Sequence, residues 1–386
     1  MRKLSVLIVF GTRPEAIKVA PLIKFMQKDE RFNLKICVTG QHRQQLDQVL
    51  EIFDIIPNFD LNLMNPGQTL AGVTSRALSG IDEAITNAKP DVVLVHGDTA
   101  TTFAGALAAF YQKIKVGHIE AGLRSFNMQE PFPEEASRVL TSRLTDFHFA
   151  PTALSRANLI DEKVCDNSIY ITGNTAVDVL SYTVRGEREF RVKFLNEIDF
   201  KKKRVIAVTT HRRENLGKPL EDICHAFKRI VNEFEDVEIV YSLHLNPAVQ
   251  ETARAVLGGE STVHFTETPL DLLDMHNLFS RCYMIITDSG GIQEEAPSMN
   301  KPVLVLRNVT ERPEGVEVGA LKLAGTNTDT IYTMAAELLN DKSLYKRMAN
   351  APNPYGDGKA SERIATALLY EYGIISEKPK KFDSLI

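Results

Sequence analysis

The 386-residue chain has no tryptophan, only four cysteines, no long apolar run and no strong excess of charge of either sign. The cysteines are far apart, with no CxxC and no Cys/His ligand spacing, so we expect free thiols and no metal site. The formal net charge of −5 gives no overall basic field, so neither nucleic acid nor an anionic membrane is an expected partner. Any anionic ligand must therefore be held locally.

The first apolar run, residues 4–10, follows a basic start but is too short to span a membrane. No small-residue cleavage site follows it, so we interpret it as a buried strand rather than a signal peptide and expect a cytoplasmic protein. Three catalytic motifs are also missing. No GxGxxG follows a strand, and there is no GxxxxGK[ST] and no GxSxG, which argues against a dinucleotide site, a P-loop and a serine-hydrolase elbow.

Apolar runs of strand length alternate with amphipathic runs of helix length, a rhythm typical of parallel sheets covered on both faces. The predicted strands cover 4–10, 34–39, 91–96, 115–119, 205–209, 237–243, 263–265, 283–287 and 302–306. The predicted helices cover 14–28, 43–54, 69–88, 99–111, 133–145, 185–197, 219–235, 247–257, 269–280, 290–297 and 328–349.

The pattern weakens near 168–190, where we place a domain boundary. The sequence thus predicts two Rossmann-like, doubly wound α/β domains, 1–175 and 176–358, with a final helix at about 359–376 that packs back onto the first domain. Such sheets bind ligands beyond the carboxyl ends of their strands, so two of them imply one central cleft.

Two cations follow the first predicted strand, in the segment GTRPEAIK (11–18). Pro14 is well placed as the first helical residue, which puts Arg13 in the loop and Lys18 one turn into the helix. Both side chains are candidates to face an anion, although Arg13 alone is equally explained as a solvated loop residue.

Three carboxylates follow strands or begin a helix in the same domain. Asp98 follows the strand 91–96, where helix capping is an equal explanation. Glu120 follows the strand 115–119, where capping does not explain it. Glu134 lies in the first turn of a helix, where the helix dipole already favours a carboxylate.

In the second domain, the segment DSGGIQEEAP (288–297) directly follows an apolar strand. Gly290 and Gly291 allow a ligand close to the backbone, and a helix start offers unpaired N–H groups, which suits phosphate. Glu295 does not favour the same phosphate, so we expect it to hold sugar or ribose hydroxyls. Two further strand ends carry cations, in THRREN (210–215) and at Arg312; a solvated basic turn is the alternative for the first.

Together these segments resemble the non-hydrolysing UDP-N-acetylglucosamine 2-epimerases of the glycosyltransferase-B superfamily. The matching segments are GTRPEAIK (11–18), QHR (41–43), HGDT (96–99), HIEAGLR (118–124), PEE (133–135), THRREN (210–215), HLNP (244–247), DSGGIQEEAP (288–297) and TERPE (310–314). The resemblance implies a glycosyltransferase-B fold, a homodimer, and an isomerase that interconverts UDP-GlcNAc and UDP-ManNAc without NAD or any other cofactor. The implied route eliminates UDP to a 2-acetamidoglucal and adds it back, which supplies ManNAc units for surface polysaccharides.

The resemblance also implies roles for individual residues. The catalytic set would be Asp98, Glu120, Glu134 and His211. The UDP-sugar would be held by Arg13, Lys18, His211, Ser289, Gly290, Gly291, Glu295 and Arg312. Some members bind a second UDP-GlcNAc beside the active site, and the candidates for such an allosteric site here are Gln41, His42, Gln44 and His244.

Three alternatives stay open from the sequence. A hydrolysing 2-epimerase would release ManNAc and UDP, and a sugar transferase of the same architecture would need an acceptor site. A nucleotide-sugar-binding regulator would not need three carboxylates beside a phosphate site, because they repel the ligand. Which carboxylate serves as base and which as acid is also open.

Overall fold

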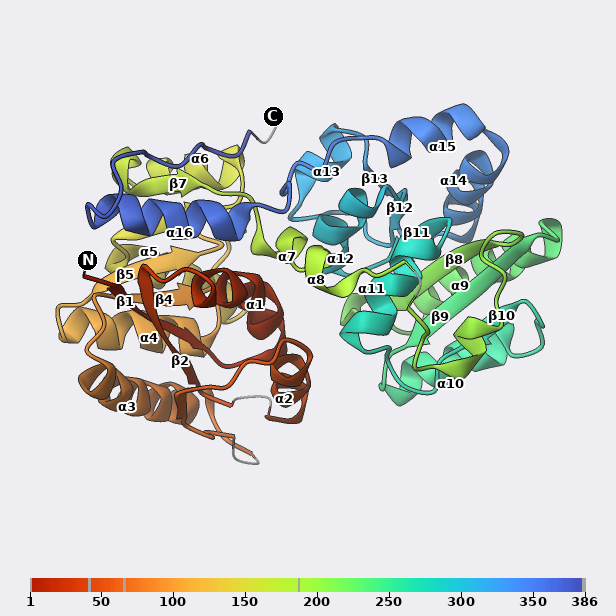
Figure 1. The fold of residues 1–386 in the computed structure, drawn as a ribbon. Helices are drawn as coiled ribbons and strands as arrows, with labels where there is room; N and C mark the ends of the chain where they lie inside the picture. The colour runs from red at the N-terminus through yellow and green to blue at the C-terminus, as the bar shows by residue number, and fades with distance from the viewer. Residues whose placement is uncertain (1, 41–42, 65–66, 187, 384–386) are drawn as a thin grey trace. The chain divides into compact units, whose positions relative to one another are not determined.

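The computed structural model describes residues 2–40, 43–64, 67–186 and 188–383. The chain divides into two compact units (Figure 1): unit 1 comprises Met1–Val179 and Tyr355–Ile386, and unit 2 comprises Leu180–Pro354. Each unit is an α/β domain built on one parallel sheet, which confirms the fold class predicted from the alternation of apolar runs.

The sheet of unit 1 has seven strands, all paired in parallel. Their order across the sheet is β3 (Phe59–Asp60), β2 (Phe32–Val38), β1 (Leu4–Phe10), β4 (Val92–His96), β5 (Lys115–Ile119), β6 (Phe147–Ala150) and β7 (Ile169–Ile171). The strand order reverses between β1 and β4, and such a reversal is where doubly wound sheets bind ligands.

Two helical layers cover this sheet (Figure 1). In one layer α3 (Leu70–Ala88) packs against α4 (Ala100–Tyr111), and α4 packs against α5 (Glu134–Leu144). Leu7 and Val9 of β1 alternate in sequence and enter the core under α3 and α4. In the other layer α1 (Arg13–Gln27) packs against α2 (Arg43–Ile52), α7 (Thr175–Asp178) and α16 (Ala360–Glu371), while α6 (Ala153–Asp161) packs on β6 and β7.

Helix α16 belongs to unit 1 although it follows unit 2 in the sequence. The buried Asp178 carboxylate accepts the backbone N–H groups of Ala360 (3.1 Å) and Ser361 (2.6 Å), which satisfies two donors at the start of this helix. The chain therefore crosses between the units twice, near 179–180 and 354–355.

The sheet of unit 2 has six parallel strands. Their order is β10 (Val263–Phe265), β9 (Val237–Leu243), β8 (Arg204–Thr210), β11 (Met284–Thr287), β12 (Val303–Val305) and β13 (Leu321–Leu323). Its switch point lies between β8 and β11.

Alternate residues of these strands serve two cores, as the two-residue period of a strand requires. Ile206 and Val208 of β8 pack under α9 (Lys218–Glu233), α10 (Pro247–Leu257) and α14 (Thr328–Asn340). Val205 and Ala207 pack on the opposite side, under α11 (Leu272–Arg281). The remaining helices are α8 (Leu180–Thr183), α12 (Gly290–Glu295), α13 (Pro313–Glu317) and α15 (Lys342–Ala349).

The predicted helix over 185–197 is wrong. The described residues of this segment hold only a short 3₁₀ helix, Lys193–Asn196, because side chains of α11 accept backbone N–H groups there instead. The Asp274 carboxylate accepts the N–H groups of Arg191 (3.2 Å) and Val192 (3.0 Å), and Asn277 Oδ1 accepts that of Arg185 (2.9 Å).

The structure differs from the prediction in two smaller ways. The single helix predicted over 328–349 is divided at Asp341, whose side chain accepts the N–H groups of Ser343 (2.7 Å) and Leu344 (3.0 Å) and so begins a new helix, α15. Strands β3, β6, β7 and β13, each two to four residues long, were not predicted, although β10, β11 and β12, of three or four residues, were. No helix in the described part of the chain is long and apolar enough to cross a membrane.

Candidate functional site

Glu15 joins two strand-end loops at the switch point of unit 1. Its buried carboxylate accepts the backbone N–H groups of Gly11 (3.0 Å) and Thr12 (2.8 Å), and its other oxygen accepts the Thr99 hydroxyl (2.7 Å). Burial raises the pKa of Glu15, although each of these hydrogen bonds opposes the shift. Glu15 therefore fixes the loop after β1, which begins α1, to the loop after β4.

Glu120 follows β5 and is bound by two side chains from distant parts of the unit. Its Oε2 accepts hydrogen bonds from Lys18 Nζ (2.5 Å) and from Asn174 Nδ2 (2.8 Å). Its φ of +65° lies in the left-handed region, which a non-glycine residue adopts at a cost and which clusters at functional sites. Burial works to raise the pKa of Glu120, but the charge of Lys18 and the hydrogen bonds outweigh it and hold the pKa below its usual range. Glu120 is therefore a carboxylate at neutral pH.

His96 ends β4 beside this pair and is almost fully buried. Its Nε2 lies 4.0 Å from Glu120 Oε2, too far for a hydrogen bond, and neither ring nitrogen has a partner among the described residues. Burial lowers the pKa of His96 to about 4, so the ring is neutral at neutral pH. An unpaired buried polar group costs about 1–3 kcal/mol, which makes a structural role for this imidazole a poor explanation.

Asp98 is the second predicted carboxylate, and it lies in an ion-pair network rather than capping α4. Its Oδ2 accepts Arg138 Nε (3.0 Å) and Nη2 (2.7 Å), while Thr99 caps the helix. Arg138 also donates to Glu135 (3.1 Å), the buried neighbour of Glu134. Glu134 itself is half-buried at the start of α5 and forms no ion pair with any described residue.

His211 follows β8 and is oriented by a fully buried carboxylate. Its Nδ1 lies 2.8 Å from Asp288 Oδ1, and its backbone N–H also donates to Asp288 (3.0 Å). Asp288 accepts Arg212 N–H (2.9 Å) and Asn215 Nδ2 (3.0 Å) as well. Burial would raise the pKa of Asp288, but the hydrogen bond and charge of His211 and the backbone donors lower it below its usual value. A carboxylate only accepts, so Nδ1 of His211 carries a proton and Nε2 is the nitrogen that remains for a ligand.

The two glycines after Ser289 meet different surroundings. A Cβ on Gly290 would lie 2.7 Å from Arg312 Nη1 and 2.9 Å from its Cζ, so this glycine lets the guanidinium pack on the backbone. A Cβ on Gly291 would meet nothing within 4 Å, so the backbone there is open to a ligand. The buried Glu294 accepts Arg312 Nε (2.8 Å) and fixes the guanidinium in place. Helix α12 has only six residues, so it offers local N–H groups rather than a long helix dipole.

Glu295, the predicted ribose ligand, is positioned by a buried histidine. His276 Nε2 lies 3.2 Å from Glu295 Oε2, and the other ring nitrogen bonds the Thr183 hydroxyl (2.7 Å). The hydroxyl and the carboxylate thus hold the imidazole between them, and Glu295 keeps a defined direction.

The predicted residues fall into two sets, one in each unit, in segments that follow the carboxyl ends of the strands. The unit 1 set contains Arg13, Lys18, Asp98, Glu120 and Glu134. The unit 2 set contains His211, Ser289, Gly290, Gly291, Glu295 and Arg312.

The four predicted allosteric residues come from two parts of the chain, 41–44 and the segment after β9. Gln41 and His42 lie outside the described residues, and Gln44 lies on α2. His244 follows β9, with its ring centroid 6.3 Å from that of His211. A regulatory role for these four residues stays a prediction.

Sequence reasoning missed the residues that hold the predicted ones in place. They are Glu15, Arg138, Asn174, His276 and Asp288. The buried His96, which lies beside Glu120 without a hydrogen bond to it, was missed as well. Glu15 had a readable signal, since Thr12 and Glu15 form the spacing of a capping box. The others act across long sequence separations, which no local pattern reveals. Among the described residues no group of three or more His, Cys, Asp or Glu side chains is arranged to hold a metal ion.

Known proteins match this chain over nearly its whole length. The sequence profile described as UDP-N-acetylglucosamine 2-epimerase matches residues 24–369. The UDP-N-acetylglucosamine 2-epimerase of Bacillus subtilis (strain 168) is 54% identical over 382 residues, covering 99% of each chain. A crystal structure from Listeria monocytogenes gives a TM-score of 0.93 at 48% identity, covering 99% of this chain and 100% of that one. The UDP-GlcNAc 2-epimerase of Neisseria meningitidis, solved with UDP-GlcNAc bound, gives 0.85 at 45% identity, covering 95% and 100%. The chain therefore belongs to the UDP-N-acetylglucosamine 2-epimerase family, as its ordered motifs predict.

Proposed function

We propose that this protein is a non-hydrolysing isomerase that interconverts UDP-GlcNAc and UDP-ManNAc by inverting C2 of the sugar. The observation that carries the proposal is the gathering of Asp98, Glu120 and Glu134 at the strand ends of unit 1, in a member of this family. Inversion at C2 requires proton transfer on both faces of that carbon, and hence more than one proton-transfer group.

The C2 proton of a hexosamine is not acidic in the ground state, because no carbonyl group is adjacent. In the proposed route the C1–O bond breaks, the electron pair leaves with UDP, and a carboxylate removes the C2 proton to give a 2-acetamidoglucal. UDP then adds back to C1 while a proton is delivered to the opposite face of C2. Atoms and charge balance without an external oxidant or reductant, so the route needs no redox cofactor.

The residues of unit 1 suit the proton transfers. Lys18 holds Glu120 as a carboxylate, which is the form that accepts a proton. Arg138 balances the charge of Asp98. With two of the three carboxylates paired to cations, the repulsion that they exert on an anionic substrate is reduced.

The residues of unit 2 suit departing UDP. We assign the diphosphate to the backbone of Ser289 and Gly291, to Arg312 and to His211, whose Nε2 is directed by the buried Asp288. Donors that are already oriented stabilise developing charge without reorganising. Glu295, held by His276, is assigned to the ribose hydroxyls.

Two further parts of the proposal concern the protein's setting. We propose that it works as a cytoplasmic homodimer through the helices of unit 1. Exposed Phe110 and Tyr111 at the end of α4, and Leu140 on the neighbouring α5, support an interface there. Sedimentation of the purified chain tests this: a dimer in the wild type that dissociates in Phe110→Asp supports the interface, and a monomeric wild type contradicts it.

Product analysis tests the activity. The purified chain with UDP-GlcNAc and no NAD should yield UDP-ManNAc up to a fixed equilibrium ratio. Free ManNAc with UDP would instead assign the hydrolysing reaction, and an unchanged substrate would favour a transferase that lacks its acceptor. Asp98→Asn separates an enzyme from a binding protein, because it should abolish turnover while UDP affinity holds or improves.

A further inference from the structure

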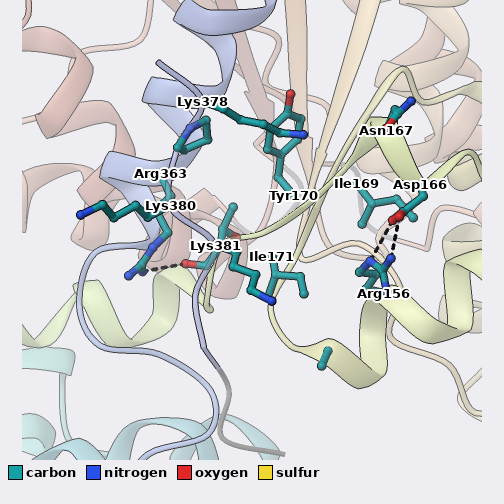
Figure 2. Close-up of a pocket in the computed structure, with 13 residues that line it drawn as sticks. Arg156, Asp166, Asn167, Ile169, Tyr170, Ile171, Arg363, Lys378, Lys380 and Lys381 are labelled. Carbon is teal, nitrogen blue, oxygen red and sulfur yellow. Dashed lines mark hydrogen bonds and ion pairs between the residues drawn. The ribbon is translucent and has the colours of Figure 1, made fainter.

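A cavity lies in unit 1 beside the chain that follows α16 (Figure 2). Its volume is about 550 Å³, and its described lining includes none of the residues assigned above. The walls come from the start of α6, the edge strand β7 and the C-terminal tail, residues 378–381. It is therefore separate from the two sets of strand-end residues.

Cations from three segments of the chain converge on this cavity. The basic lining residues are Arg156, Arg363, Lys378, Lys380 and Lys381, whereas the one acidic lining residue is Asp166. Arg156 pairs with Asp166 (2.7 Å), and Arg363 pairs with Asp357 (2.7 Å). The three lysines form no ion pair with a described residue. In a chain with a net charge of −5, this leaves a local positive excess that favours an anion.

The tail is anchored, so its lysines are not free to disperse. Phe382 is buried, its backbone N–H donates to Ile171 O of the edge strand (2.8 Å), and its ring lies 5.5 Å from the Arg363 guanidinium carbon. At the other end, Lys378 Nζ lies 5.1 Å from the centroid of the Tyr170 ring. A site held in place before binding loses less conformational entropy when a ligand arrives.

The floor of the cavity is apolar, which limits the kind of anion that fits. Ile169, Ile171 and Pro379 line it together with Tyr170. Figure 2 shows the side chains of Lys378 and Lys381 directed toward the β7 residues Tyr170 and Ile171, whereas that of Lys380 extends the other way. The volume falls in the usual range for small-molecule sites. Positive charge at the rim and apolar surface below suit a molecule with phosphates at one end and an aromatic body at the other.

We propose that this cavity is a second nucleotide site. Lys378, Lys381 and Arg156 bind a group of two or more phosphates, and the base lies on the apolar floor of Ile169, Ile171 and Pro379. Lysine provides a point charge without a fixed hydrogen-bond geometry, so the site selects charge and size more than phosphate orientation. His244, one of the predicted allosteric residues, is not among the described residues that line it.

Calorimetric titration of ADP into the full-length protein, with no UDP present, tests the proposal, and the variants below localise the binding. We expect one ADP to bind, with an affinity that falls as salt rises. The double variant Lys378→Ala/Lys381→Ala should lose at least tenfold in affinity. Lys380→Ala, which removes the same charge from the same tail but from a side chain that points elsewhere, should stay within twofold of the wild type.

A second variant tests the opposite wall of the cavity. Arg156→Ala leaves the Asp166 carboxylate without its partner beside the phosphates, and should also weaken ADP at least fivefold. Pyrophosphate should bind more weakly than ADP, because it does not use the apolar floor. Absence of ADP binding, equal affinity in the wild type and the double variant, or equal affinity for pyrophosphate and ADP would each overturn the proposal. The readout is binding, so it does not depend on epimerase activity.

Discussion

Replacing Asp288 by asparagine should disable His211 while leaving the fold intact. The carboxylate accepts three donors at Oδ2, the N–H groups of His211 and Arg212 and the amide of Asn215, but at Oδ1 it meets only His211. The asparagine NH₂ group is therefore expected at the Oδ1 position, where it donates to Nδ1 of His211. That contact requires a proton on Nε2 instead of Nδ1, which reverses the tautomer offered to the ligand.

The size of the effect follows from the loss of the hydrogen bond that His211 Nδ1 makes to the charged Asp288 carboxylate. A hydrogen bond to a charged group contributes about 1.5–3 kcal/mol, and each 1.36 kcal/mol on a barrier is about tenfold in rate. We therefore expect kcat to fall about 10- to 150-fold, with a loss in the free energy of unfolding of about 1.5–3 kcal/mol. Because the pKa of Asp288 is lowered in the folded protein, its contribution to stability is present above the unfolded pKa and lost as pH falls through the folded value. The variant should show less of this loss in acid.

Asp274→Asn is the matched control. Asp274 is also a buried carboxylate of unit 2 that accepts two backbone N–H groups, from Arg191 and Val192, but it touches no residue assigned to the substrate. Thermal unfolding should show a similar loss of stability in both variants. Steady-state kinetics well below both Tm values should show the loss of kcat only in Asp288→Asn. Equal loss of kcat in the two variants, or full activity in Asp288→Asn, would refute the orienting role.

Four further variants test unit 1 and the glycine pair. Lys18→Met removes the cation that keeps the pKa of Glu120 low, so the acid limb of the kcat/KM profile should move to higher pH and activity at neutral pH should fall; an unmoved acid limb contradicts this assignment. Gly290→Ala places a methyl group against the guanidinium and should weaken UDP binding about tenfold or more, whereas Gly291→Ala has open space and should cost less; calorimetry with UDP compares the two, and the reverse order is the contrary result. His96→Leu removes two buried nitrogens that have no partner among the described residues and should raise the free energy of unfolding by about 1 kcal/mol while lowering kcat; a loss of stability is the contrary result.

The sequence predicted the fold well because both sheets are made of uninterrupted apolar strands. Strands β1 and β9 have a clear sequence signal, since they pair on both sides and are buried on both faces. The edge strands β3, β7 and β13 were missed, because two or three residues give only a weak period; β10, an edge strand of three residues, was nevertheless predicted. The segment 185–197 was mistaken for a helix because its charge pattern is helical, while the groups that satisfy its backbone lie some eighty residues further along the chain.

In the candidate site, too, the residues with a local sequence signal were predicted and their distant partners were not. Residues such as Glu120 and Ser289 could be found because a strand end is a local feature, and the sequence around it is distinctive. The groups that hold them could not: Asn174 reaches Glu120 from 54 residues away, and Asp288 reaches His211 from 77. The chemical roles of Glu120 and His211 depend on these partners, since the partners decide whether the carboxylate is ionised and which histidine nitrogen faces the ligand.

The central claim is that the C2–H bond breaks and is remade during turnover. Proton NMR of the purified chain with UDP-GlcNAc in deuterated water, without NAD, follows this directly. The account predicts UDP-ManNAc with deuterium at C2, and gradual deuteration of the UDP-GlcNAc pool as the reaction runs in reverse. UDP-ManNAc that retains the original proton at C2 would contradict the elimination route.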